Sequence, residues 1–116
     1  MKRVAVLIII AMTVIVVAGR LPAQSAPRVV DIDAKRFEFT PKEVVLKKGE
    51  VVTIRLHATD HAHGLLAKPL HLDLDAENGG TDEVTITPAD AGTFPAICDD
   101  FCGAGHGNMK MTFVVE

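Results

Sequence analysis

The chain has 116 residues, 48% of them hydrophobic, and a formal net charge of −3 at pH 7. This length limits it to one domain. The acidic balance argues against nucleic acid as a partner, because phosphate binding requires a basic surface, whereas it permits a basic protein partner.

The first predicted element is an N-terminal leader. Lys2 and Arg3 precede an almost wholly apolar run, residues 4–18, and the small residues of "LPAQSAPR" follow. This order is typical of a secretory signal, and the run is shorter than the roughly 20 residues that a spanning helix needs. We therefore expect residues 1–26 to be a signal peptide or a short membrane anchor. Residues 27–116 would form a periplasmic or otherwise extracytoplasmic domain, with 9 of the 12 basic residues and all 15 acidic ones.

The exported part has the sequence pattern of a β protein. Apolar and polar residues alternate between Gly and Pro residues, and Val30, Ile32, Phe37 and Phe39 are predicted to lie on buried faces of two short stretches. Val44 and Leu46 lead into a turn at residues 48–49. Further strands are predicted at residues 51–58, 70–74, 83–87, 92–98 and 110–115. About seven short strands predict an all-β, antiparallel Greek-key β-sandwich or barrel.

Two segments between these strands contain the residues suited to chemistry. "TDHAHGLLAKP" follows the 51–58 strand and is predicted to be a loop. "ICDDFCGAGHGNMKM" fills the connection between the last two strands. In a Greek-key sandwich two such loops can meet at one end of the molecule.

The second segment combines Cys98, Cys102, His106 and Met109. In an exported protein two cysteines usually form a disulfide. Thiolate, imidazole and thioether together nevertheless suit copper, and glycines allow the loop to fold tightly around an ion. Zinc prefers four ligands without a thioether, and an iron–sulfur cluster usually requires four cysteines. The pattern therefore favours copper.

The spacing of this loop resembles the dinuclear copper (CuA) loop of cytochrome c oxidase subunit II. The matching residues run from Cys98 through Cys102-Gly103 and His106 to Met109, and "TDHAHGLL" supplies Asp60, His63 and Gly64 in the pattern of the family's other histidine segment. The nitrous oxide reductase C-terminal domain has a similar loop. The resemblance covers most of the exported chain and implies a cupredoxin fold.

The resemblance also implies roles for individual residues. Cys98 and Cys102 would bridge two copper ions, and His63 and His106 would each bind one of them. Met109 and the backbone carbonyl of Asp100 would be weak axial ligands. Asp100 stands where the family commonly has Glu or Gln, so its shorter side chain is not expected to reach a neighbouring metal.

The implied function is electron transfer, with a c-type cytochrome or an oxidase subunit I as redox partner. The sequence shows no self-contained catalytic site, so any oxidase activity would belong to a complex. Two alternatives remain open at this point: a periplasmic copper chaperone or storage protein, and a mononuclear cupredoxin in which Cys98 is redundant or disulfide-bonded.

The remaining candidates are weaker. His61 lies two residues before His63 and is the second choice as ligand, while His57 is predicted to be exposed and His71 has no assigned role. Met111 is predicted to be a core residue, as its spacing from Phe113 indicates. Asp99 and Asp100 would border the copper, with Asp73, Asp75 and other acidic residues elsewhere. The chain has no Trp and no Tyr, and Leu65 stands where the family often has an aromatic residue.

Overall fold

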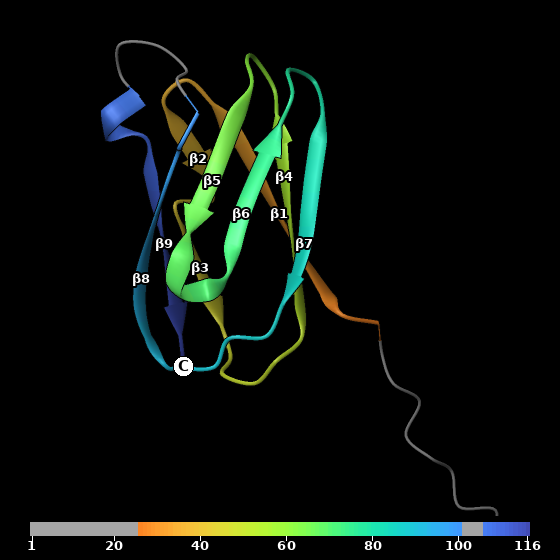
Figure 1. Ribbon diagram of the computed structural model, residues 1–116, viewed down its shortest axis with the longest axis vertical. Helices are drawn as coiled ribbons and strands as arrows, with labels where there is room; N and C mark the ends of the chain where they lie inside the picture. Colours follow the sequence, from red (N-terminus) through yellow and green to blue (C-terminus); the bar gives the residue numbers. More distant parts are fainter. Residues whose placement is uncertain (1–25, 101–105) are drawn as a thin grey trace, which may run out of the picture.

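The computed structural model describes residues 26–100 and 106–116. They form two β-sheets that pack face to face (Figure 1). One sheet has the strand order β2-β1-β4-β7, built from Glu38–Thr40, Arg28–Lys35, Val52–Ala58 and Thr81–Ile86. The other has the order β3-β9-β8-β5-β6, built from Glu43–Leu46, Lys110–Val115, Gly92–Ile97, His63–Ala67 and Leu72–Ala76. The predicted two-layer β-sandwich is confirmed.

Alternation of apolar and polar residues explains how a strand such as β4 lies on the core. In β4, Val52, Ile54, Leu56 and Ala58 are buried, while the residues between them are half-buried on the outer face. Successive side chains point to opposite faces of a strand, so this period of two gives one apolar face. Buried apolar residues from both sheets form one core, among them Ile32, Phe39, Leu46, Leu65, Leu74, Met111 and Phe113.

Two pairs of strands differ from the antiparallel arrangement that the sequence predicts. β1 runs parallel to β4, and β3 runs parallel to β9. The remaining pairs are antiparallel. The parallel pairs join segments that are not consecutive in the sequence, and residue alternation carries no information on which strand becomes a neighbour.

Three local predictions are wrong. Phe37 was expected to be buried, but it lies between β1 and β2 with 41% of its surface exposed. "HGLLA" was expected to be part of a loop and instead forms β5. The strand predicted at residues 70–74 begins later, because the short 3-10 helix η1, Lys68–Leu70, precedes β6. The chain turns from η1 into β6 through His71, whose φ of 55° is left-handed.

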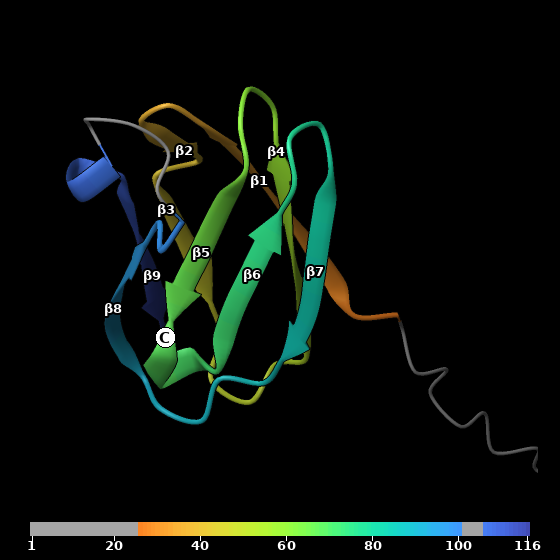
Figure 2. The ribbon, with the colours of Figure 1, turned by 45° about the horizontal axis from the view of Figure 1, so that its top comes forward.

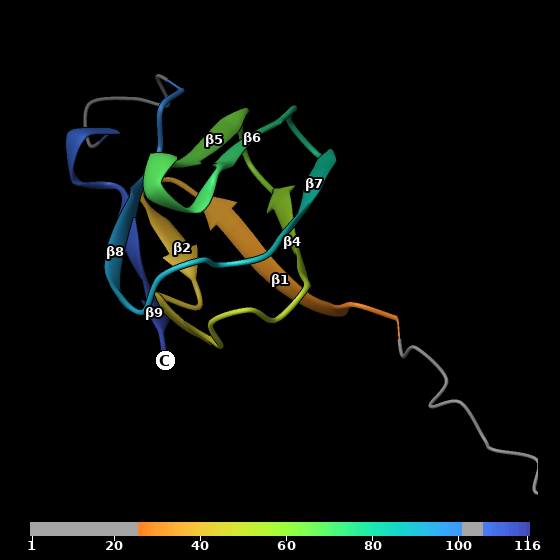
Figure 3. The ribbon, with the colours of Figure 1, turned by 60° about the horizontal axis from the view of Figure 1, so that its bottom comes forward.

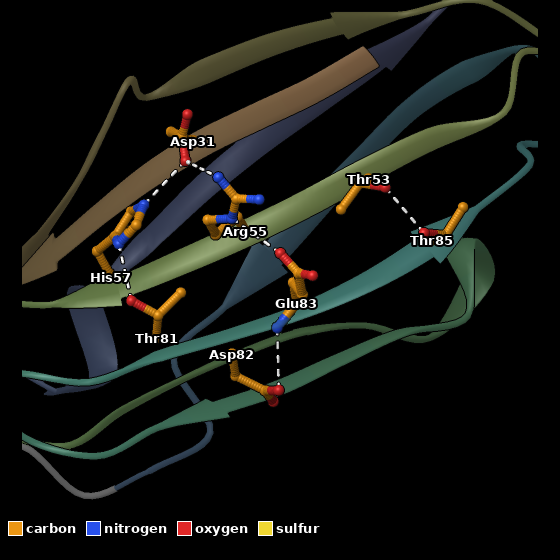
Figure 4. Close-up of polar contacts among 8 residues, drawn as sticks. All are labelled: Asp31, Thr53, Arg55, His57, Thr81, Asp82, Glu83 and Thr85. Atoms are coloured by element: carbon orange, nitrogen blue, oxygen red, sulfur yellow. Dashed lines mark hydrogen bonds and ion pairs between the residues drawn. The ribbon is translucent and has the colours of Figure 1, made fainter. Parts of the chain in front are cut away.

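The outer face of the β2-β1-β4-β7 sheet is covered by paired polar side chains (Figure 4). The ring of His57 contacts Asp31 at 2.8 Å through Nε2 and Thr81 at 2.9 Å through Nδ1. Arg55 donates to Glu83 at 2.8 Å and lies 3.6 Å from the same Asp31 oxygen. These contacts satisfy the polar groups of this face among themselves.

Both ends of the described chain lie at one end of the sandwich. β1 begins there, and the C-terminal residue Glu116 follows β9 there, as Figure 3 shows from below. The turns β1–β2, β4–β5 and β6–β7 lie at the opposite end, which Figure 2 brings forward. Within the described residues no helix has the length and apolar character needed to cross a membrane.

Candidate metal centre

The described ligand candidates gather at the end opposite the termini. His63 is the first residue of β5, and Cys98 directly follows β8. Met109 directly precedes β9, and the short 3-10 helix η2, His106–Asn108, lies just before it. The two segments that contain the predicted ligands therefore meet at one end of the sandwich (Figure 1). Cys102 and the side chain of His106 lie outside the described residues.

His63 is fully buried, and both of its ring nitrogens have partners. Nε2 lies 2.8 Å from Oδ1 of Asp60, and Nδ1 lies 3.9 Å from Sγ of Cys98. An ionised carboxylate only accepts hydrogen bonds, so Nε2 carries the proton in a neutral ring. The lone pair of Nδ1 then faces the thiol. This is the tautomer that a metal ligand requires, with the other nitrogen held by a carboxylate.

Asp60 is itself fixed by the neighbouring hairpin. Its second oxygen accepts the backbone N–H of Arg36 at 2.9 Å, and the N–H of Thr59 donates to the carbonyl of Ala34 at 3.1 Å. Desolvation acts to raise the pKa of Asp60, but the hydrogen bonds from His63 and from the Arg36 backbone, with the charge of Arg36, lower it overall. The carboxylate is therefore held in its ionised form.

Cys98 is connected to two other candidate ligands. Its thiol, in a side chain only 3% exposed, donates to the carbonyl oxygen of Asp100 at 3.3 Å. Its backbone N–H donates to the carbonyl of Met109 at 3.1 Å, and Met109 is itself buried. The side chains of His63 and Cys98 and the Asp100 carbonyl thus converge, with Met109 tied to the same strand end.

His61 and His57 are less buried than His63 and have other contacts. His61 is half-buried, and its Nδ1 donates to the carbonyl of Ala62 at 2.9 Å. Its ring centroid lies 6.0 Å from that of His63. His57 was predicted to be simply exposed, but it is half-buried in the polar contacts of the other sheet. Of these three histidines, it is His63 whose ring nitrogen Nδ1 contacts the Cys98 sulfur.

A group of carboxylates beside the site was not anticipated. Asp73 and Asp75 were expected to lie elsewhere, but the pairing of β6 with β5 places Asp75 opposite Gly64 and Asp73 opposite Leu66. Carboxylate oxygens of Asp73, Asp75 and Asp99 lie within 4.8 Å of one another. Desolvation and the charge of Asp99, together with other nearby carboxylates, raise the pKa of Asp75. Cross-strand register, which the sequence does not give, produces this group.

The donor set fits copper. A buried imidazole with its Nδ1 lone pair directed at a thiol sulfur, beside a backbone carbonyl and near a buried methionine, offers the nitrogen and sulfur ligands of copper sites. The β-strands that hold these groups belong to one packed core, so the ligands are positioned before any ion binds.

The sequence profile of the cupredoxin-like domain family matches residues 6–115. This chain belongs to the cupredoxin-like domain family. Cytochrome c oxidase subunit 2 of Thermus thermophilus is 26% identical to it over 80 residues, which are 69% of this chain and 59% of that protein. The matched part of this chain thus spans less than two thirds of the length of this relative.

Two solved structures show the same fold. The periplasmic domain of subunit II of cytochrome oxidase of Bradyrhizobium japonicum superposes with a TM-score of 0.71 at 18% identity, covering 79% of this chain and 86% of that one. Auracyanin A, a "blue" copper protein of Chloroflexus aurantiacus, superposes with a TM-score of 0.61 at 21% identity, covering 78% of this chain and 100% of that one. The predicted cupredoxin fold is confirmed.

Proposed function

We propose that this cupredoxin-like chain is an extracytoplasmic electron-transfer protein with a dinuclear CuA-type copper centre. In this proposal two copper ions would be held mainly by Cys98, Cys102, His63 and His106, with Met109 and the Asp100 carbonyl as weaker ligands. The observation that carries the proposal is the position of His63. Its Nδ1 faces Cys98 at 3.9 Å while its Nε2 is held by Asp60 at 2.8 Å.

Each described residue has a definite task in this function. When bound, the copper pair would supply a site that takes up and gives back one electron. Asp60 fixes the tautomer and the orientation of His63. The buried surroundings of Cys98 and Met109 exclude water and hold the sulfur atoms in place. Because His63, Cys98 and Met109 lie at the ends of packed strands, the protein would hold these side chains in place as an electron is taken up or released, which would favour fast electron transfer.

The function also implies partners and a location. A c-type cytochrome would be the electron donor, and an oxidase subunit I would be an acceptor if the chain works within an oxidase complex. The likeness to oxidase subunit 2 supports this proposal. No side chain is assigned to oxygen chemistry, so oxygen reduction would take place in that partner. Residues 1–26 would direct the domain out of the cytoplasm as a cleaved signal or a short anchor.

Copper counting combined with electron paramagnetic resonance (EPR) tests the proposal. We expect two coppers per chain and a signal from one unpaired electron shared over both nuclei. Cys98→Ser should abolish this signal because one of the two thiolate ligands is lost. Met109→Leu should alter the spectrum and the reduction potential, whereas Met111→Leu, a substitution of a buried residue in the next strand, should leave both unchanged. A two-copper signal that survives Cys98→Ser would refute the ligand assignment.

The second candidate is a mononuclear blue copper carrier. The likeness to auracyanin A, whose whole length is covered, favours it. A single copper with a localised electron that persists in Cys98→Ser would establish this function instead. An EPR-silent and readily exchanged Cu(I) would instead identify a copper chaperone or storage protein.

A further inference from the structure

His61 differs from His57 and His63 in how its ring nitrogens are used. Its Nδ1 donates to the carbonyl oxygen of Ala62 at 2.9 Å, so in the neutral ring the proton lies on Nδ1 and the lone pair lies on Nε2. In the described part of the chain, Nε2 of His61 has no hydrogen-bond partner. Imidazole nitrogen is a copper ligand. The local hydrogen bond therefore leaves His61 ready to bind a metal ion through Nε2.

The position of His61 relative to His63 is the second observation. The two ring centroids lie 6.0 Å apart, with an angle of 62° between the ring planes. His63 is fully buried, whereas His61 is half-buried in the β4–β5 turn at the ligand end of the sandwich (Figure 2). His61 is therefore the more accessible of two adjacent imidazoles, each of which is held in a tautomer that leaves one lone pair for a metal.

The described ligand candidates are themselves shielded from water. The exposed fractions of His63, Cys98 and Met109 are 0%, 3% and 1%. His63 directs its Nδ1 lone pair at Cys98, because its Nε2 is held by Asp60. A copper ion that arrives from solution has to exchange its solvent ligands for protein ligands, and losing the former without replacement is costly. A ligand nearer the surface would lower this cost.

We propose that His61 is a copper-entry ligand, which takes up Cu(I) through Nε2 and passes it to His63 and Cys98. This inference rests on the proposed copper binding at these two residues, but it holds for one copper ion or for two. In the transfer, the bond from copper to His61 breaks while bonds to Nδ1 of His63 and to Sγ of Cys98 form, and the thiol proton passes to water. Copper stays Cu(I) throughout, so no oxidant or reductant is required.

His57 and His71 do not offer this combination of a free lone pair and a short distance to His63. Both ring nitrogens of His57 have partners on the other sheet, Asp31 at 2.8 Å and Thr81 at 2.9 Å (Figure 4). His71 is exposed between η1 and β6, at the far end of β5 from His63. Its removal is therefore a control for the loss of an accessible imidazole elsewhere on the chain.

The rate of copper uptake tests the entry role. The metal-free full chain is mixed anaerobically with a coloured Cu(I) chelate, and the absorbance of the chelate is followed as copper moves to the protein. His61→Phe keeps an aromatic ring beside His63 but removes the ligand nitrogen, and it should lower the uptake rate by about tenfold. His71→Asn places a residue that tolerates the left-handed φ of 55°, and it should change the rate by less than about twofold.

A second substitution at the same position separates ligation from packing. His61→Met supplies a thioether, which binds Cu(I), on a flexible side chain without a ring, so its uptake rate should return close to that of the unaltered chain. If His61 only packs against His63, then His61→Phe would load at the normal rate and His61→Met slowly. Support requires that His61→Phe alone be slow among the three variants. Every other order of their rates would overturn the proposal.

Equilibrium measurements separate this inference from the proposed function. Because His61 is absent from the final ligand set, all three variants should reach the copper content of the unaltered chain, with copper affinity within about twofold and the same EPR spectrum after oxidation. A weaker affinity or a changed spectrum in His61→Phe would make His61 part of the final site and would overturn the entry role. A count of one copper would refute the dinuclear centre and leave the order of uptake rates decisive. A chain that takes up no Cu(I) would overturn both.

Discussion

The carboxylate of Asp99 lies against Gly64, at the place where any other residue would carry its Cβ. A Cβ built on Gly64 would contact Oδ1 of Asp99 and would approach Oδ1 of Asp75 to 3.1 Å. Gly64 therefore makes room for the residue that directly follows Cys98. The outer surface of β5 and the backbone beside the candidate ligand are coupled through this contact.

Gly64→Ala should disturb the copper spectrum more than it disturbs the fold. The Asp99 carboxylate ends a flexible side chain and can move, so the free energy of unfolding should fall by less than about 1 kcal/mol. Its displacement should shift the backbone next to Cys98 and change the copper EPR and absorption spectra. Asp99→Ala in the Gly64→Ala background should restore them. Failure of this rescue would show that the contact does not transmit the effect.

Removal of the Asp60 carboxylate should weaken copper binding. Without its partner at 2.8 Å, His63 loses the contact that fixes its proton on Nε2. We expect Asp60→Ala to lower copper affinity by about 10- to 100-fold, the usual effect of losing such a supporting carboxylate. Competition titration against a copper chelator measures this. Asp33→Ala, on the exposed face of β1, is the control, and a loss of the same size there would contradict the role of Asp60.

Asp75→Asn should stabilise the chain at neutral pH. Folding raises the pKa of Asp75. At a pH above this raised pKa, the ionised carboxylate therefore destabilises the folded state. Stability from this group should increase as pH falls through the folded pKa, and the advantage of Asn should disappear below the unfolded value. Because Asp75 is exposed, we expect a gain of only a few tenths of a kcal/mol. Thermal unfolding at pH 7 and pH 3 should show a gain only at pH 7.

Arg55→Gln should have a small, salt-dependent effect on stability and none on the metal centre. Arg55 joins Asp31 and Glu83 across three strands, but all three side chains are substantially exposed (Figure 4). Exposed ion pairs contribute little and are screened by salt. The melting temperature should therefore fall slightly in low salt and much less in 0.5 M salt, about the level at which screening is strong. A changed copper spectrum would contradict the separation of the two faces.

The sequence predicts those parts of the fold that depend on local pattern. β9 was predicted over the residues that it occupies, and the buried face of β4 follows from alternation alone. β5 was missed because four of its five residues are buried, so alternation is absent. Phe37 was misplaced because it lies in a turn, where its apolar character does not determine burial.

In the candidate site, too, local sequence pattern predicts some features and misses others. The sequence put Cys98 and Met109 in one segment and His63 in another, and the family resemblance implied that they share a site; the described structure places them at one end of the sandwich. The contacts that support the candidate ligands, around Asp60 and Gly64, come from residues distant in sequence. The Arg36 N–H on Asp60 and the carboxylates beside Gly64 depend on how hairpins and strands pair. Local sequence patterns do not encode such pairing.

The position of the two chain ends has a practical consequence. Arg28 begins β1, and Glu116 ends the chain, at the end of the sandwich away from His63 and Cys98 (Figure 3). A tag or surface linker joined at either position would leave the ligand end open to solution. The domain is therefore suited to oriented attachment on an electrode, where voltammetry could record its reduction potential while His63 and Cys98 face the solution.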